Sequence, residues 1–324
     1  MRKKNNITEQ KIIYKYLNKL NFNKSETFNF NNDAAFLKKK KNKEIVVTND
    51  TIVESVDFFK SDPAESVAQK IITYNLSDIS SMGADPYAYT LSLSLPKKIT
   101  HEWISKFIKK ILYFQNKYNF FLLGGDISQS NQLIISSNFF GYVEKKNILK
   151  REFPNMGDDI WVTGYLGDSA IGLALRKKQI ILNYIQTKYF TNKFLFPRPC
   201  MIGSLINKIA TSAIDISDGF YGDLNKIINS KLIGANIYSS KIPYSSNLKK
   251  LFATKKIEPN DILNAGDDYE LIFTAPKHKS TKLKNIASKY KYKITKVGQI
   301  TRVIGIYVDD QKILKLKSPY QHFF

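Results

Sequence analysis

The chain has 324 residues and carries 50 Lys and Arg against 28 Asp and Glu, a formal net charge of +22. This length predicts about two domains, and 43% hydrophobic with 24% charged residues is typical of a globular protein with a sizeable core. No apolar run reaches the roughly 18 residues of a membrane span, and no apolar segment of a signal peptide follows the basic N-terminus. The single cysteine, Cys200, excludes an intrachain disulfide, so we expect a reduced, cytoplasmic protein without membrane spans.

The positive charge raises the question of nucleic-acid binding. Only five of the 50 basic residues are arginines, the residue type that favours bidentate contacts with bases and phosphates. The lysines are scattered through every segment, together with many Asn and Ile. One dense run, Lys38–Lys41 followed by Lys43, lies between two apolar segments and predicts an exposed loop. We therefore expect solvated lysine-rich faces and no nucleic-acid partner.

The first half of the chain predicts alternating helices and strands. Apolar residues at helical spacing predict helices over 8–20, 63–83 and 100–117, with Thr8 as the cap of the first. Apolar runs and period-two alternation predict strands over 44–48, 90–95, 120–123 and 133–143. Gly124-Gly125-Asp126 directly follows the third of these strands and is predicted to form a turn.

The second half repeats this alternation after a polar stretch over 145–155, which predicts a domain boundary. We expect an N-terminal domain over 1–150 and a C-terminal domain over 151–324. In the second domain the predicted strands are 160–163, 213–215 and 269–275, and the predicted helices are 169–177, 201–211 and 218–229. The pattern indicates a two-domain chain of the α/β (α+β) class.

Six aspartates stand among small or apolar neighbours, which is unusual for a carboxylate. They are Asp33, Asp50, Asp78, Asp126, Asp215 and Asp218. A buried carboxylate is costly unless it is paired or bound to a cation, and Mg²⁺ is held in proteins by a few carboxylates together with substrate phosphates. Helix caps and turns explain most single Asp residues in loops. The set as a whole, without a comparable set of His or Glu, favours a site with several metal ions and phosphate.

Glycine turns add a weaker indication of phosphate binding. Gly124-Gly125 after a strand lets backbone N–H groups approach an anion, and Gly164-x-x-Gly167 joins a predicted strand to a predicted helix. The sequence contains neither a P-loop motif nor the paired motifs of protein kinases. If the chain binds ATP, it does so outside those folds.

Five segments in a fixed order, and the ending Tyr320-Gln321-His322-Phe323, resemble the thiamine-monophosphate kinase family, part of the aminoimidazole ribonucleotide synthetase superfamily. The segments are Asn75–Ala84, Leu123–Asp126, Val162–Ala170, Ala213–Gly219 and Gly266–Leu271. The resemblance implies phosphorylation of thiamine monophosphate to thiamine diphosphate with ATP and several Mg²⁺ ions. It also implies a homodimer in which the N-terminal domains share a barrel, with ATP near that interface.

The resemblance also implies roles for individual residues. Positions that match Mg²⁺ ligands of the family are Asp33, Thr48, Asp50, Asp78, Asp126, Asp215 and Asp218, and Asn49 stands where a ligating Thr is common. Positions that match ATP contacts are Gly125, Asp126, Arg151 and Ser217. Positions that match substrate contacts are Asp57, Asp267 and Tyr320.

Two departures from the family pattern concern this site. The stretch that is Gly-Asp-Asp in the family is Asn31-Asn32-Asp33 here, with one carboxylate fewer. Asp57 stands where the family has a substrate-contacting His, so an acid replaces a group that can carry positive charge.

The implied reaction agrees with the scarcity of histidine. A phosphate acceptor already carries an anionic oxygen, so direct in-line transfer needs alignment and charge neutralisation rather than a general base. Two other activities of the superfamily are alternatives. Selenophosphate synthetase requires a reactive Cys near the N-terminus, whereas Cys200 is distant. The segments Asp268–Leu271 and Tyr320–Phe323 argue against aminoimidazole ribonucleotide synthetase. A non-catalytic nucleotide or nucleic-acid binder is the alternative from another class.

Overall fold

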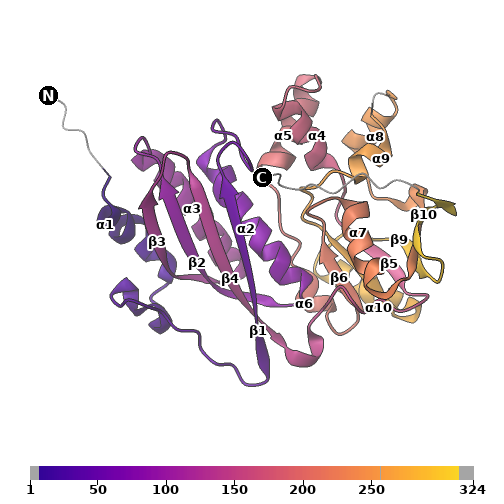
Figure 1. The fold of residues 1–324 in the computed structure, drawn as a ribbon, viewed down its shortest axis with the longest axis horizontal. Helices are drawn as coiled ribbons and strands as arrows, with labels where there is room; N and C mark the ends of the chain where they lie inside the picture. Colours follow the sequence, from indigo (N-terminus) through magenta and orange to yellow (C-terminus); the bar gives the residue numbers. More distant parts are fainter. Residues whose placement is uncertain (1–6, 256, 314–324) are drawn as a thin grey trace. The chain divides into compact units, whose positions relative to one another are not determined.

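The computed structural model describes residues 7–255 and 257–313, and its contacts divide the chain into two units (Figure 1). One unit holds the chain up to Ile79 together with Asp85–Lys145, and the other holds Ser80–Ala84 together with the chain from Lys146 on. The division therefore differs in detail from a single cut after residue 150, because a short piece of the first half belongs to the second unit.

The first unit is built on a four-stranded sheet in the order β1-β4-β2-β3. The strands are β1 (Lys43–Val53), β2 (Asp85–Leu95), β3 (Phe121–Gln129) and β4 (Ile134–Glu144). Strand β4 is antiparallel to β1 and to β2, whereas β2 and β3 are parallel. Strands β1 and β3 are consequently the two edges of this sheet.

Two long helices, α2 (Ala64–Ser81) and α3 (His101–Tyr118), cover one face of this sheet (Figure 1). Helix α3 begins where Thr100 accepts a hydrogen bond from the Trp103 backbone N–H, and it ends at Asn119 in the left-handed conformation. Its buried stripe, which packs toward the sheet, consists of Ile104, Phe107, Ile108, Ile111 and Phe114. The helices predicted over 63–83 and 100–117 are confirmed.

The N-terminal segment packs along β3 and changes helix type several times. It runs through α1 (Glu9–Ile12), a π-helix (Ile13–Leu17) and two 3₁₀ segments (Asn18–Asn21 and Ser25–Phe30). Thr8 caps α1 through its side chain, as predicted. Farther along, Phe22 and Leu37 pack on a small cluster formed by Ala88, Phe121 and Leu123 of the sheet.

The turn predicted at Gly124-Gly125-Asp126 is wrong, because these residues lie inside β3. Gly125 pairs with Leu91 of β2, and a Cβ atom on Gly125 would lie 1.8 Å from the Leu91 carbonyl oxygen. The glycine therefore marks a close approach of two backbones in a strand. Local sequence cannot distinguish this role from a turn, since both require glycine.

The second unit contains a seven-stranded sheet in the order β11-β10-β7-β9-β5-β8-β6. The strands are β5 (Asp159–Thr163), β6 (Ser212–Asp215), β7 (Gly234–Ile237), β8 (Leu271–Ala275), β9 (Ile294–Thr301), β10 (Gly305–Val308) and β11 (Gln311–Lys312). The three predicted strands of this half are confirmed as β5, β6 and β8. The other four were not predicted, because β7, β10 and β11 have four residues or fewer, and Lys296 and Gly298 interrupt the apolar pattern of β9.

Helices cover both faces of the seven-stranded sheet. The helices of this unit are α4 (Asp168–Arg176), α5 (Tyr184–Leu195), α6 (Gly203–Ile206), α7 (Phe220–Ile228), α8 (Ser246–Phe252), α9 (Pro259–Leu263) and α10 (Ser280–Lys289). Ile160 and Val162 of β5 join a core with α7, whereas Trp161 between them joins a second core with α6 and α10. Consecutive residues thus point to opposite faces, as strand geometry requires. The helix predicted over 201–211 is wrong beyond its first turn, because Ile209 N–H closes a tight turn on Ile206 that leads into β6.

The piece Ser80–Ala84 is held within the second unit by polar contacts. The Ser80 hydroxyl donates to the Cys200 carbonyl oxygen at 2.6 Å and accepts from the Gly203 N–H at 3.1 Å. A Cβ atom on Gly203 would lie 1.7 Å from the Ser80 carbonyl oxygen, so only glycine permits this approach. The Asn207 side chain donates to the Gly83 carbonyl oxygen at 2.8 Å.

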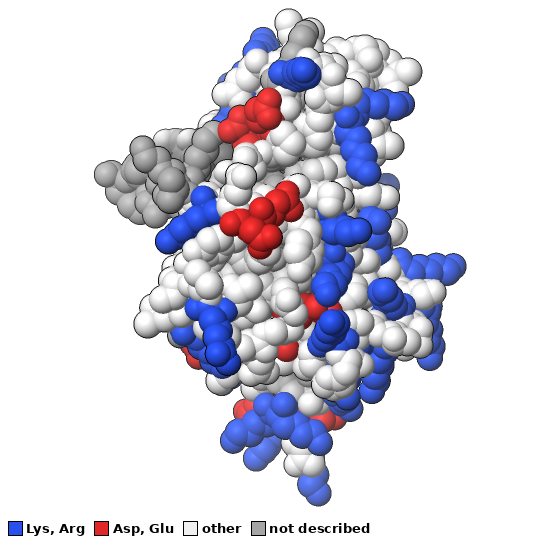
Figure 2. Space-filling model, turned by 90° about the vertical axis from the view of Figure 1, so that its right-hand side faces the viewer, with Lys and Arg blue, Asp and Glu red and all other residues white. Residues whose placement is uncertain are grey.

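The helices and the charged surface of the described residues agree with two expectations from the composition: no membrane span, and lysines spread over the surface. None of their helices is both long enough and apolar enough to cross a bilayer. On the face that Figure 2 shows, Lys and Arg side chains are dispersed, and groups of Asp and Glu lie between them.

Candidate active site

Thr48 and Asp50 of β1 lie opposite Asp78 of helix α2. Residues two apart in a strand share a face, which places both side chains on the side of the sheet that α2 covers. The Thr48 hydroxyl donates to Oδ2 of Asp78 at 2.5 Å, so the two elements meet through a short polar contact. Three predicted metal ligands are therefore brought together.

Asp50 has the chemistry that a cation would satisfy. Its Oδ2 atom is buried and has no hydrogen-bond partner among the described residues. Burial, together with repulsion from the nearby carboxylates of Asp78 and Asp57, raises the pKa of Asp50 to about 7. A divalent cation relieves both the burial of charge and the repulsion, and oxygen donors suit Mg²⁺, so the residues present fit this ion.

The described side chains do not complete a metal centre by themselves. Among residues 7–255 and 257–313, no group of three or more His, Cys, Asp or Glu has the geometry to hold a metal ion. Asn49 lies on the other face of β1, where its amide donates to Asn138 Oδ1 at 2.8 Å. The side chain of Asn49 is thus not brought to Thr48 and Asp50.

Asp33 and Asp126 line a second place in the first unit, a pocket of about 200 Å³. Gly124 and Gly125 of β3 line the same pocket, together with Asn32 and the N-terminal segment. Both carboxylates are exposed. The pocket therefore joins the glycine pair and two of the predicted metal ligands.

The segment that carries Asp33 is anchored by Glu26, which the sequence did not single out. Glu26 is 1% exposed, accepts a hydrogen bond from Tyr87 Oη at 2.5 Å and pairs with Lys38 Nζ at 3.2 Å. Burial alone would raise the pKa of Glu26, but hydrogen bonds from Tyr87, its own backbone and Ser25, and the contact with Lys38, lower it to about 2. Glu26 therefore holds its negative charge firmly in place.

Lysines of the same segment also contact the sheet. Lys40 Nζ lies 4.2 Å from the ring centroids of both Tyr87 and Tyr142, and the Tyr142 hydroxyl donates to the Lys38 carbonyl oxygen. The exposed loop predicted at Lys38–Lys41 is confirmed, and the contacts of Lys38 and Lys40 attach it to the sheet. No local pattern indicated these contacts, because their partners lie 45 or more positions away.

The two groups of carboxylates in the first unit are far apart within one chain. Asp50 pairs with Ser137, Ser137 with Leu91, and Leu91 with Gly125, which makes one row across all four strands. Three strand spacings of about 4.8 Å separate the two backbones by about 14 Å. One ion cannot bind Asp50 and Asp126 of the same chain.

Asp57 closes a turn at the end of β1. Its Oδ2 atom accepts a hydrogen bond from the Val53 N–H at 2.8 Å, and its carbonyl oxygen accepts one from Lys70 Nζ at 3.0 Å. The carboxylate is also near enough to Asp50 to raise the pKa of that group. Asp57 thus adds a negative charge beside the Asp50–Asp78 pair.

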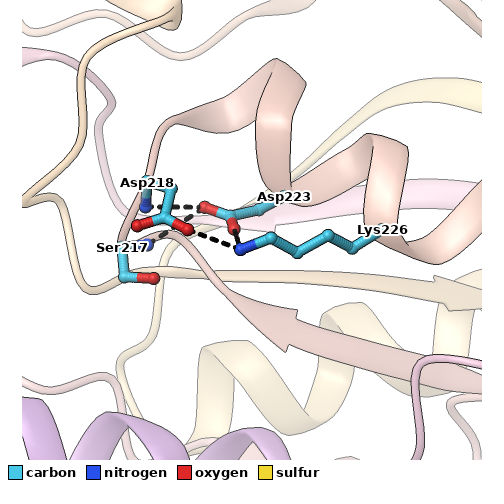
Figure 3. A network of polar contacts seen from close by, with 4 residues as sticks. All are labelled: Ser217, Asp218, Asp223 and Lys226. Atoms are coloured by element: carbon cyan, nitrogen blue, oxygen red, sulfur yellow. Dashed lines mark hydrogen bonds and ion pairs between the residues drawn. The ribbon is translucent and has the colours of Figure 1, made fainter. Parts of the chain in front are cut away.

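In the second unit, Asp215, Ser217 and Asp218 lie where β6 leads into α7. Asp215 is buried at the end of β6. The backbone N–H groups of Ser217 and Asp218 both donate to Oδ2 of Asp223, at 3.1 and 3.0 Å (Figure 3). Lys226 Nζ then donates to Asp218 Oδ2 at 2.6 Å and to Asp223 Oδ1 at 2.8 Å.

The segment before β8 places further carboxylates. Asp267 accepts a hydrogen bond from the Tyr269 hydroxyl at 3.0 Å, and both oxygens of Asp268 accept from the Gly167 N–H at 2.9 Å. Burial raises the pKa of Glu270 to about 7, and its carboxylate accepts from the Thr163 hydroxyl. Arg151 is exposed in a turn, and Tyr320 lies outside the described residues.

Family models match most of the chain. The model described as AIR synthase related protein, N-terminal domain, matches residues 31–143, and the corresponding C-terminal domain model matches 155–310. A thiamine-monophosphate kinase from Buchnera aphidicola subsp. Acyrthosiphon pisum is 38% identical over 98% of this chain and 99% of the relative. The chain belongs to the thiamine-monophosphate kinase family. The family membership and the enzyme class expected from the sequence are confirmed.

Solved structures of thiamine-monophosphate kinases have the same fold. The enzyme from Stenotrophomonas maltophilia K279a is 31% identical, with a TM-score of 0.80 over 87% of this chain and 90% of that one. A structure of AaThiL complexed with AMPPCP and TMP is 28% identical, with a TM-score of 0.78 over 90% of this chain and 91% of that one. The expected two-domain fold of mixed helices and strands is confirmed at this level.

For a thiamine-monophosphate kinase, the structure sorts the predicted residues into separate groups. Thr48, Asp50 and Asp78 form one group, and Asp33 and Asp126 share a pocket. Asp215 and Asp218 belong to the second unit. Sequence analysis missed Glu26, Asp223 and Lys226, although the position of Asp223 in the first turn of α7 is a common place for an acid that receives backbone N–H groups.

Proposed function

We propose that this chain transfers a phosphoryl group from ATP to thiamine monophosphate and so forms thiamine diphosphate. The observation that carries the proposal is the Asp50–Asp78 pair, with one buried oxygen unpartnered, in a chain 38% identical to a thiamine-monophosphate kinase over 98% of its length. The complex of AaThiL with AMPPCP and TMP supports the choice of co-substrate and acceptor.

We infer direct in-line transfer assisted by several Mg²⁺ ions. Bound Mg²⁺ would neutralise phosphate charge, and its proposed protein ligands are Asp33, Thr48, Asn49, Asp50, Asp78, Asp126, Asp215 and Asp218. The Thr48 hydroxyl orients the Asp78 carboxylate by donating to its Oδ2 atom. The acceptor phosphate is already anionic, so the proposal assigns no general base.

The remaining role assignments follow the family pattern. For ATP we propose Gly125, Asp126, Arg151 and Ser217, and for the substrate Asp57, Asp267 and Tyr320. Gly125 lines the pocket that Asp33 and Asp126 also line, and its lack of a side chain permits the close approach of the Leu91 backbone. The hydrogen bonds that Asp57 and Asp267 already make orient their carboxylates before any substrate arrives.

We also propose that two copies of the chain pair through their first units as a homodimer with a shared barrel. Both edge strands, β1 and β3, carry proposed ligands, and about 14 Å separates these within one chain. Ile45 and Val47 on β1 are exposed, as expected for an edge that another copy covers. Sedimentation at micromolar concentration tests this proposal, and a monomer alone would contradict it.

The activity is tested by coupling ADP release to a chromogenic reaction, with thiamine monophosphate, ATP and Mg²⁺. We expect stoichiometric formation of thiamine diphosphate. Thiamine, which lacks the acceptor phosphate, serves as the control substrate. Turnover of thiamine without turnover of thiamine monophosphate would reject the proposed function, and nucleotide binding without any turnover would indicate a non-catalytic binder.

A further inference from the structure

Lys226 stands in an unusual position for a lysine. Its ammonium group lies between two carboxylates of the second unit, 2.6 Å from Asp218 Oδ2 and 2.8 Å from Asp223 Oδ1 (Figure 3). The Asp223 side chain is fully buried, whereas about one third of the side chains of Asp218 and Lys226 is exposed. A single positive charge therefore serves two acids, one of them a proposed metal ligand.

The two acids play different parts in this network. Asp223 uses its other oxygen to accept from the backbone N–H groups of Ser217 and Asp218, so it shapes the turn and is fixed in place. Asp218 uses only Oδ2 for Lys226, and Figure 3 shows its second oxygen pointing away from the ammonium group. The bond from Lys226 thus fixes the orientation of Asp218 and neutralises part of its charge.

We propose that Lys226 is a positioning residue that acts as a built-in counter-ion of Asp218 and holds back cation binding there until nucleotide phosphates add negative charge. The ammonium group occupies one of the two oxygens that a divalent ion would use, and it repels that ion. The part of the proposal that involves nucleotide rests on the proposed function. The part that concerns a cation alone does not.

The test is a titration with Mn²⁺ alone, followed by electron paramagnetic resonance of the free ion. Lys226→Gln keeps hydrogen-bond donors but removes the charge, and Lys226→Arg keeps the charge. We expect Lys226→Gln to bind one Mn²⁺ on the order of tenfold more tightly, which corresponds to about 1.4 kcal/mol. Lys226→Arg is expected to match the unchanged chain, and the gain is expected to vanish in the double variant Lys226→Gln/Asp218→Asn.

Unchanged or weaker Mn²⁺ binding by folded Lys226→Gln would overturn the proposal, as would a gain that persists in the double variant. Because Asp223 is buried, the Gln variant risks misfolding, which circular dichroism detects. The single variant Asp218→Asn covers that case. We expect it to leave the titration with Mn²⁺ alone unchanged, and to weaken Mn²⁺ binding several-fold once AMPPCP is present.

A loss of Mn²⁺ binding by Asp218→Asn without nucleotide would contradict the proposal, because it would show that the cation already occupies Asp218 despite Lys226. These titrations contain no thiamine monophosphate and measure no turnover. A failure of the proposed kinase activity would therefore leave the result with Mn²⁺ alone intact, and the two failures are distinguishable.

Discussion

Replacing Glu26 with Gln is expected to weaken the first unit without changing the shape of the side chain. In the folded chain the pKa of Glu26 is about 2, against 4.5 for an unperturbed glutamate. At about 1.4 kcal/mol per pKa unit, this shift corresponds to an upper limit of about 3.5 kcal/mol. Gln keeps neutral hydrogen bonds with Tyr87 and Ser25, so we expect a loss of about 2 kcal/mol in the free energy of unfolding at pH 7.

The pH dependence gives this prediction its sign. Because the folded-state pKa of Glu26 lies below the unfolded one, its contribution is fully present above about pH 4.5 and is lost as the pH falls toward 2. The difference between Glu26→Gln and the unchanged chain is therefore expected to shrink over this range. Tyr87→Phe, which removes one hydrogen bond and leaves the charge, is the matched control, with an expected loss of about 1 kcal/mol.

The assay is a urea titration with a short hydrogen-exchange pulse at each concentration, read by mass spectrometry on separate peptides. Peptides from β2 and β4 report the first unit, and peptides from β8 report the second. We expect the midpoint to move for β2 and β4. A change below about 0.5 kcal/mol at pH 7, or a difference that stays constant from pH 7 to pH 2.5, would refute the reasoning.

Three further predictions concern the site. Asp78→Asn and Asp126→Asn are each expected to lower turnover on the order of 100-fold or more with unchanged circular dichroism, and near-normal turnover at saturating Mg²⁺ would argue against their roles. Asp57→Asn keeps the acceptor for the Val53 N–H and removes a negative charge. Because repulsion of the substrate phosphate is then weaker, we expect KM for thiamine monophosphate to fall about fivefold at similar kcat. A raised KM would indicate that Asp57 attracts the cationic thiazolium ring of the substrate. Gly125→Ala forces a contact of 1.8 Å with the Leu91 backbone and is expected to lower the free energy of unfolding by more than about 2 kcal/mol. Gly124→Ala has open space around its Cβ and is expected to lower it by well below about 1 kcal/mol. Equal losses for the two variants in urea titrations would contradict the close-approach argument.

Sequence alone predicted the long elements of the fold, and the structure brings some of the predicted acidic residues close together. The amphipathic spacing that defines α2 and α3 is local information, and so is the acid at the end of β6. What sequence did not yield depends on partners distant in the chain. Gly125 was mistaken for a turn because its partner Leu91 lies 34 positions earlier, and Glu26 was overlooked because Tyr87 and Lys38 give it its role.

The arrangement of the acids was likewise beyond sequence analysis. Matching of sequence positions gives no distances, so sequence analysis assigned Asp50 and Asp126 to the same metal site. The register of four strands separates them. Lys226 was one of many lysines in a basic chain, and only the three-dimensional position of Asp223 distinguishes it from those on the surface.

The contacts of Ser80 have a consequence for dividing this protein into fragments. Ser80 belongs to the second unit and pairs with the Cys200 carbonyl oxygen and the Gly203 N–H, yet it precedes the rest of that unit by more than sixty residues of chain. A fragment that starts at Lys146 would lack it and would leave both backbone groups without their partner. During synthesis on the ribosome, the helix that ends at Ser81 is made long before Cys200 and Gly203 emerge to receive it. A chimeric protein that combines the first unit of one relative with the second unit of another therefore has to take residues 80–84 from the same relative as the second unit.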